Sequence, residues 1–256
     1  MYFFINKRII LEEIRSKGIL GLSSFILNLF KKIFYIIYLR FDLKTIRKNY
    51  TSESLVDYVF LKCEGILRPL QIRYEILKLL QILKQRSPKI IIEIGTARGG
   101  TLFLFTKVAS IDALLISIDL PGGPSGQGYP KVKIPLYKSF ALPTQNLILI
   151  RANSHDFAIL NKVKAILKGR KVDFLFLDGD HTYQGVKRDF EMYSPLVQKD
   201  GIIGFHDIHL PISPNSTLGV FKLWNKIKKD YNYEEIVQDW NEKHIGIGIL
   251  KEKKET

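Results

Sequence analysis

Three ionisable side chains, each able to exchange a proton or bind a metal ion, follow a short apolar run in the second half of the chain. Asp178, Asp180 and His181 come directly after Phe174–Leu177, and a helical pattern begins two residues later. Ligands of open α/β sheets bind at the carboxyl ends of strands, so these residues are candidates for acid–base or metal chemistry. The structural alternative is that Asp180 or Thr182 caps the following helix while His181 lies in solvent.

A glycine-rich turn follows the apolar run Ile90–Ile94. It reads Gly95-Thr96-Ala97-Arg98-Gly99-Gly100, and its glycines allow the backbone to approach a ligand beside free N–H groups of a helix start. The dinucleotide spacing G-x-G-x-x-G is absent. Glu93, just inside the strand end, would repel a pyrophosphate but suits a ligand with a sulfonium or ammonium group.

The next two predicted strands end in polar groups that suit a nucleoside. Asp119 follows Leu114–Ile118 and is placed to accept hydrogen bonds from a ribose hydroxyl pair. Ser154 lies in the polar stretch Arg151–Asp156 after the third run, where an adenine could be bracketed. Together, Glu93 and Asp119 indicate an adenosyl ligand with a positively charged far end.

Short apolar runs alternate with helical segments over most of the chain. The runs are Ile90–Ile94, Leu114–Ile118, Leu147–Ile150, Phe174–Leu177, Ile202–Phe205 and Ile245–Leu250. Continuous apolar strands that alternate with helices predict a parallel sheet covered on both faces. Residues 121–145 interrupt this pattern with prolines and glycines, and long loops of this kind are usually binding loops or lids. We expect a lid-like loop there, on the ligand side.

Length and composition predict one α/β domain with an appendage. The 256 residues are 46% hydrophobic, and the single cysteine, Cys63, excludes an intramolecular disulfide and a multi-cysteine zinc site. We expect a basic helical extension over residues 1–51 and the main domain over residues 52–256. The net charge is +14, and residues 1–50 carry ten Lys or Arg against three acids. This surplus favours an anionic partner.

Residues 19–41 repeat apolar side chains at helical spacing, with Lys31 and Lys32 on another face. Such a helix can lie in a membrane interface; alternatively, it packs on the main domain or on a second subunit. The longest uncharged run in this region, Gly18–Phe30, is thirteen residues, short of the roughly 20 that span a bilayer. We therefore expect a cytoplasmic protein, peripheral on the membrane or homo-oligomeric, with no nucleic-acid partner.

These motifs resemble the class I S-adenosylmethionine-dependent methyltransferases. Glu93–Gly99 stands as their first motif, with Ala97 where many members carry glycine. More narrowly, Glu93–Gly100, Ser117–Gly123 and Leu177–Asp189 are similar to the branch of the metal-dependent macrolide-sugar O-methyltransferases and cephalosporin-hydroxylase-like proteins. The resemblance covers roughly residues 65–250. It implies a Rossmann-like, doubly wound, seven-stranded sheet that is mostly parallel with an antiparallel last strand, and S-adenosylmethionine bound at Glu93, Gly95, Thr96, Ala97, Gly99, Asp119, Ser154 and Asp178.

The same resemblance implies a divalent metal and a general base. Carried onto this chain, the ligands are Asp178, His206 and Asp207, and the base is His181. His206 stands where the sugar enzymes have Glu, so the expected Mg²⁺ could be replaced by Mn²⁺ or another transition ion. His209 is close enough in sequence to compete with His206.

The sequence thus predicts an O-methyltransferase that acts on a sugar hydroxyl of a glycan, glycolipid or secondary metabolite. Two other interpretations remain open: an NAD-dependent Rossmann oxidoreductase and a non-catalytic, membrane-associated scaffold that binds S-adenosylmethionine. The acceptor is a small molecule or a lipid-linked sugar.

Overall fold

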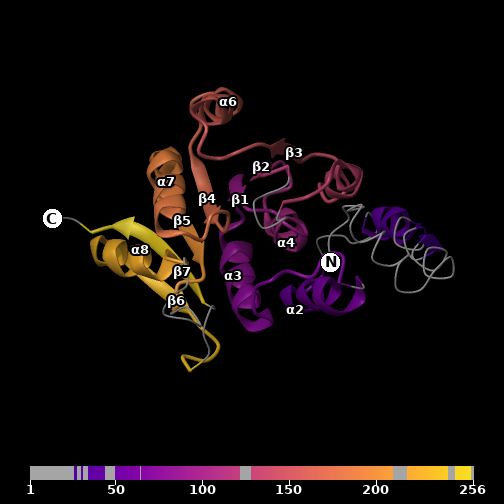
Figure 1. The fold of residues 1–256 in the computed structure, drawn as a ribbon, viewed down its shortest axis with the longest axis horizontal. Coiled ribbons are helices and arrows are strands. Elements are labelled where there is room, and N and C mark those ends of the chain that lie inside the picture. The colour runs from indigo at the N-terminus through magenta and orange to yellow at the C-terminus, as the bar shows by residue number, and fades with distance from the viewer. Residues whose placement is uncertain are drawn as a thin grey trace, which may run out of the picture.

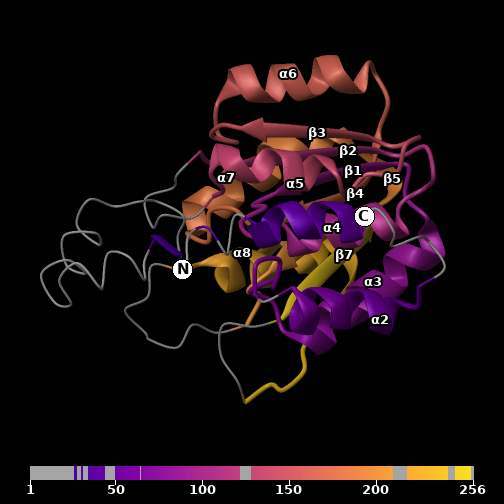
Figure 2. The ribbon, with the colours of Figure 1, turned by 90° about the vertical axis from the view of Figure 1, so that its right-hand side faces the viewer.

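A seven-stranded sheet in the order β3-β2-β1-β4-β5-β7-β6 forms the centre of the protein. The computed structural model describes residues 26–27, 30, 34–43, 50–63, 65–121, 128–209, 218–241 and 246–254. The strands are β1 (Ile90–Ile94), β2 (Leu114–Asp119), β3 (Asn146–Arg151), β4 (Val172–Leu177), β5 (Val197–His206), β6 (Tyr231–Ile236) and β7 (Ile247–Lys253). Figure 2 shows β3, β2, β1 and β4 one below another in this order.

The pairing of the strands confirms the predicted sheet. β1 pairs in parallel with β2 and β4, β2 with β3, and β4 with β5. β7 runs antiparallel to both of its neighbours, β5 and β6. β6 was absent from the apolar runs expected to form strands, because its sequence YNYEEI is polar and only Ile236 is buried.

Helices cover both faces of this sheet. The described helices are α2 (Ser52–Asp57), η1 (Tyr58–Lys62), α3 (Arg73–Arg86), α4 (Gly100–Val108), η2 (Lys131–Lys133), α5 (Ile134–Lys138), α6 (Phe157–Leu167), α7 (Tyr183–Tyr193), η3 (Ser194–Leu196), α8 (Val220–Ile227) and η4 (Lys228–Asp230). In Figure 1, α2, α3 and α4 lie on the opposite side of the sheet from α7 and α8. Two buried clusters fill these two layers, as expected where strands such as β1 are buried along their whole length.

The segment expected to form a lid-like loop is only partly irregular. Residues 122–127 lie outside the described part of the chain, whereas η2 and α5 occupy 131–138. Leu136, Tyr137 and Phe140 are fully buried in the cluster that also contains α4. The second half of this segment therefore belongs to the core, because its apolar side chains follow a helical rather than a loop pattern.

The described part of the N-terminal extension packs on the main domain. Residues 34–43 are helical, and Ile36, Leu39 and Leu43 are buried in the cluster of α2 and α3. The hydroxyl of Tyr35 donates to the carbonyl of Lys62 at 2.8 Å. Arg40 is exposed, and so are seven large apolar or aromatic side chains of the described residues before position 44: Ile26, Leu27, Phe30, Phe34, Ile37, Tyr38 and Phe41. The remaining residues of the predicted helix 19–41 lie outside the described residues, and no described helix is long and apolar enough to cross a membrane.

Candidate functional site

The site is built where the carboxyl ends of β1, β4 and β5 meet. Asp178, directly after β4, donates its N–H to the carbonyl of Ile94 at 2.9 Å, and Gly95 donates to that of Ile118 at 2.9 Å. Gly95 has a φ of +92°, and a Cβ there would lie 2.0 Å from the carbonyl oxygen of Asp178. Only glycine fits this position, because the two strand ends approach each other so closely.

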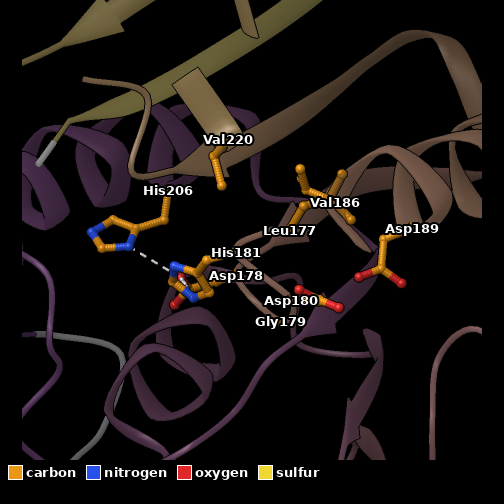
Figure 3. Close-up of a pocket in the computed structure, with 9 residues that line it drawn as sticks. All are labelled: Leu177, Asp178, Gly179, Asp180, His181, Val186, Asp189, His206 and Val220. Atoms are coloured by element: carbon orange, nitrogen blue, oxygen red, sulfur yellow. Dashed lines mark ion pairs between the residues drawn. The ribbon is translucent and has the colours of Figure 1, made fainter. Parts of the chain in front are cut away.

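Asp178, His181, His206 and Asp207 form one cluster, which we call the acceptor-side cluster. Asp178 Oδ1 lies 3.0 Å from His206 Nδ1 and 3.5 Å from His181 Nε2. His181 Nδ1 lies 2.6 Å from Asp207 Oδ2. Figure 3 shows the two imidazoles beside Asp178, with Asp189 on the side away from His206. The sequence predicted all four residues for this site, and the fold brings them together.

Charge and burial act against each other on the two imidazoles. Burial by itself lowers the pKa of His206, but the carboxylates of Asp178 and Asp207 outweigh it and raise that pKa to about 9. Burial likewise opposes protonation of His181, while its hydrogen bond to Asp207 and the charge of Asp178 raise its pKa above the ordinary value. The cluster therefore attracts positive charge, whether from a proton or from a cation.

Three residues of the cluster could hold a metal ion. One donor atom each of Asp178, His181 and His206 lies within 4.8 Å of the other two. Among the described residues, Asp178 Oδ1 and His206 Nδ1 are buried without a hydrogen-bond partner, although they face each other. Buried polar atoms are rarely left unpaired, so the donor set fits a divalent cation.

His209 and Asp180 take other roles. The ring of His209 contacts that of Trp240, with 5.2 Å between the centroids. Asp180 Oδ1 accepts from the N–H of Thr182 at 2.9 Å, and Thr182 is the N-cap of α7, its hydroxyl accepting from Gly185. Asp180 and Thr182 thus stabilise the start of α7, as the structural alternative predicted. His181 does not lie in solvent but belongs to the acceptor-side cluster.

The predicted cofactor residues form a turn beside this cluster. Pro69–Gln71, Gly95–Arg98, Gly100, Thr101 and Asp178 line one pocket. Asp119 braces the turn, because its Oδ2 accepts from the N–H groups of Thr96 at 3.2 Å and Ala97 at 2.7 Å. Ala97 has a φ of 44°, a left-handed conformation that glycine adopts more readily than alanine. Burial raises the pKa of Asp119 to about 6.

Glu93 and Ser154 lie apart from the lining of this pocket. Glu93 is fully buried, and its Oε1 accepts from the hydroxyl of Thr101 at 2.6 Å. Burial raises the pKa of Glu93 to about 8, so its charge develops readily only when a cation lies nearby. The carbonyl of Ser154 accepts from the hydroxyl of Tyr193 at 2.9 Å, which fixes the turn after β3.

Two polar residues of the site were missed in the sequence. Gln71, just before α3, donates its Nε2 to Asp178 Oδ2 at 2.5 Å; a lone amide between apolar residues gives no signal. Glu75 of α3 is fully buried and accepts from the N–H groups of Gln238 and Gly246. Its position on the apolar stripe of α3 was a usable signal, since buried acids are rare without a partner.

Comparison with known proteins identifies the domain. A family model described as a methyltransferase domain matches residues 92–208, from β1 through β5. Residues 92–208 of this chain are therefore similar to a methyltransferase domain. Uncharacterized protein R132 of Acanthamoeba polyphaga mimivirus is 34% identical over 140 residues, which make up 55% of this chain and 61% of the viral protein. This chain thus spans less than two thirds of that relative's length.

Solved structures agree with the fold described above. The O-methyltransferase TomG from Streptomyces achromogenes, involved in tomaymycin synthesis and bound to SAM, has a TM-score of 0.54, with 14% identity over 81% of this chain and 92% of TomG. An O-methyltransferase from Bacillus cereus in complex with SAH has a TM-score of 0.54, with 14% identity over 78% of this chain and 91% of its own. The predicted Rossmann-like fold is confirmed.

Proposed function

We propose that this protein transfers a methyl group from S-adenosylmethionine to a hydroxyl oxygen, with a divalent ion at the acceptor-side cluster. One observation carries the proposal. Asp178 lines the pocket that contains the glycine turn, and it also lines a second pocket with His181 and His206. The pocket proposed for the cofactor and the acceptor-side cluster therefore adjoin at this carboxylate. Methyl transfer requires such adjoining sites, because the methyl carbon and the acceptor oxygen must come within about 3–3.5 Å of each other.

The reaction breaks the sulfonium carbon–sulfur bond and forms a carbon–oxygen bond. The hydroxyl loses its proton, and the products are a methyl ether, S-adenosylhomocysteine and H⁺. A divalent ion at Asp178 and the two imidazoles would supply Lewis acidity, which lowers the pKa of a bound hydroxyl. The protein's own part is to orient: Asp207 accepts from His181 Nδ1, so Nε2 faces Asp178 Oδ1 at 3.5 Å.

The turn residues hold the cofactor in this proposal. The backbone of the Gly95–Gly99 turn and the pocket face of Asp178 surround the methionine end, and Asp119 accepts from the ribose. Asp119 Oδ2 already accepts from two backbone N–H groups, whereas Oδ1 accepts from one, that of Leu120. Because a carboxylate oxygen has two lone pairs, Oδ1 can accept again. Glu93 would take up negative charge when the sulfonium lies nearby, because a cation lowers the pKa of a carboxyl group.

The acceptor that we propose is a sugar hydroxyl, free or lipid-linked. Its support is the resemblance of Glu93–Gly100, Ser117–Gly123 and Leu177–Asp189 to the sugar O-methyltransferase branch. The test is a methyl-transfer assay with labelled S-adenosylmethionine over a panel of glycans and lipid-linked sugars. Transfer to a sugar that is lost in Asp178→Asn supports the proposal; transfer only to catechols or other phenols contradicts the acceptor class.

Calorimetry separates this function from the oxidoreductase alternative. We expect S-adenosylhomocysteine to bind and NAD⁺ to give no heat, because the turn lacks the dinucleotide spacing and contains Glu93. NAD⁺ binding at the same affinity as S-adenosylhomocysteine would refute the proposed function.

We further propose that the exposed apolar face of residues 26–41 contacts an anionic membrane surface, where a lipid-linked acceptor would be found. The surplus of seven positive charges in residues 1–50 and the exposed aromatic rings support this contact. The double variant Phe34→Ser/Phe41→Ser should lose co-sedimentation with phosphatidylglycerol vesicles. Phe157→Ser is the matched control, since Phe157 is 64% exposed and Phe41 65%. Self-association without vesicle binding would instead indicate a dimer interface.

A further inference from the structure

Three donor atoms converge at the acceptor-side cluster without a hydrogen bond between them. Asp178 Oδ1 lies 3.0 Å from His206 Nδ1 and 3.5 Å from His181 Nε2. Ligands about 2.0–2.2 Å from a zinc-sized ion lie roughly 3–3.5 Å apart in tetrahedral or octahedral arrangements. The two separations that involve Asp178 Oδ1 thus match those within a coordination shell, and all three donor atoms lie within 4.8 Å of one another.

The outward-facing atoms of two of these ligands are already bound. Gln71 Nε2 donates to Asp178 Oδ2 at 2.5 Å, which turns Oδ1 toward the imidazoles. His181 Nδ1 lies 2.6 Å from Asp207 Oδ2; because a carboxylate only accepts, the ring carries its proton on Nδ1 and leaves the lone pair of Nε2 facing inward. Metal ligands are typically held by such an outer layer of hydrogen bonds.

A purely electrostatic pairing explains the contacts less well. His206 Nδ1 lies 3.0 Å from Asp178 Oδ1 and 3.3 Å from Asp207 Oδ1. Among the described residues, however, neither His206 Nδ1 nor Asp178 Oδ1 has a hydrogen-bond partner, although both atoms are buried. His206 itself is 6% exposed. Two unpaired buried atoms that face each other are costly, and a shared cation removes that cost.

We infer that Asp178, His181 and His206 bind a divalent first-row transition ion in preference to Mg²⁺, with Asp207 as the outer carboxylate that orients His181. Imidazole nitrogen suits Mn²⁺, Fe²⁺, Co²⁺ and Zn²⁺, whereas Mg²⁺ keeps oxygen ligands and water. This assigns His181 to the ion rather than to a separate base, and it moves Asp207 from the ligand set to the layer behind it. The inference deepens the proposed function, on which the ion's purpose rests.

The test uses full-length, tag-free protein freed of metal with EDTA and dialysed. Titration with Co²⁺ should give visible d–d absorption that saturates at one ion per chain. A thousandfold excess of Mg²⁺ should leave this absorption unchanged, whereas Zn²⁺ should abolish it. His181→Gln and His206→Gln should each weaken Co²⁺ binding by at least about 100-fold. Asp207→Asn should weaken it by roughly 10–100-fold, the usual effect of an outer partner.

A matched variant controls for the loss of a histidine. His209→Gln should leave Co²⁺ affinity unchanged, because the ring of His209 contacts Trp240. S-adenosylhomocysteine binding by each variant reports that the domain is folded. Mg²⁺ competing on equal terms with Co²⁺ would overturn the inference, and so would normal Co²⁺ affinity in His181→Gln.

The outcomes separate this inference from the proposed function. One Co²⁺ ion bound at these ligands, with no methyl transfer to any acceptor of the panel, supports the site and counts against the function. Methyl transfer by protein that binds no ion, at an undiminished rate in EDTA, supports the function and overturns the site.

Discussion

The cofactor side and the acceptor side of this site differ in how their polar atoms are satisfied. At the cofactor side, both oxygens of Asp119 accept from backbone N–H groups of the turn and of Leu120. At the acceptor side, Asp178 Oδ1 and His206 Nδ1 are buried without such a partner among the residues that the structure describes. The first side is a self-supporting backbone cradle, and the second is a set of side chains that the proposed cation would complete. Changes at the two sides should therefore have different consequences.

The largest effect is expected from Asp178→Asn. Loss of this carboxylate removes the one residue common to both pockets, so methyl transfer to the acceptor found in the panel should fall at least about 10³-fold, roughly 4 kcal/mol of transition-state stabilisation. S-adenosylhomocysteine affinity should change by less than about tenfold, because the glycine turn remains. Steady-state kinetics and calorimetry measure the two quantities. An equal loss of methyl-transfer rate and of S-adenosylhomocysteine affinity would show that the two sides do not act separately.

The backbone cradle is tested by Gly95→Ala against Gly169→Ala. Both glycines have positive φ, but a Cβ at Gly169 meets no atom within 4 Å, whereas one at Gly95 lies 2.0 Å from the Asp178 carbonyl oxygen. Gly169→Ala should cost about 1–2 kcal/mol of unfolding free energy from backbone strain alone. Gly95→Ala should cost at least about 3 kcal/mol, because the strand ends must also move apart. Urea denaturation compares them, and similar costs would show that the close approach is unimportant.

A smaller effect is expected at Asp119, and it depends on pH. Because the pKa of Asp119 is raised to about 6 and the ionised carboxylate is the form that accepts hydrogen bonds, S-adenosylhomocysteine should bind more weakly as the pH falls below about 6. Asp119→Asn should weaken binding about tenfold at pH 7.5 and remove this pH dependence. Calorimetry at pH 5.5 and 7.5 measures both; an unchanged pH dependence in the variant would assign it to another group.

The smallest effect is expected from His155, away from both sides. Asp189, whose side chain is nearly fully buried, lies 3.3 Å from His155 Nε2, and this partner raises the pKa of His155 despite burial. A raised pKa in the folded state stabilises the protein below pH 6.5 and loses that contribution as the pH rises. His155→Gln should therefore lower the melting temperature at pH 6 more than at pH 9. An equal decrease at both would indicate packing alone.

Sequence patterns predicted the layout of the site better than its contacts. Asp178 and His206 follow neighbouring parallel strands, so their proximity could be inferred from strand order alone. Gln71 could not be inferred, because it lies 107 residues from its partner Asp178 and follows no periodic pattern. The left-handed φ of 59° at Asp207 was equally hidden in the sequence.

The side-chain amide of Gln71 lies between the cofactor side and the acceptor side of the site. It lines the cofactor pocket and holds the outer oxygen of Asp178, so an occupant of the pocket that moves this amide changes the orientation of a metal ligand. Binding at the two places is then thermodynamically linked, and the linkage is reciprocal: if S-adenosylmethionine strengthens ion binding by some factor, the ion strengthens cofactor binding by the same factor. The protein would then bind S-adenosylmethionine and the ion cooperatively.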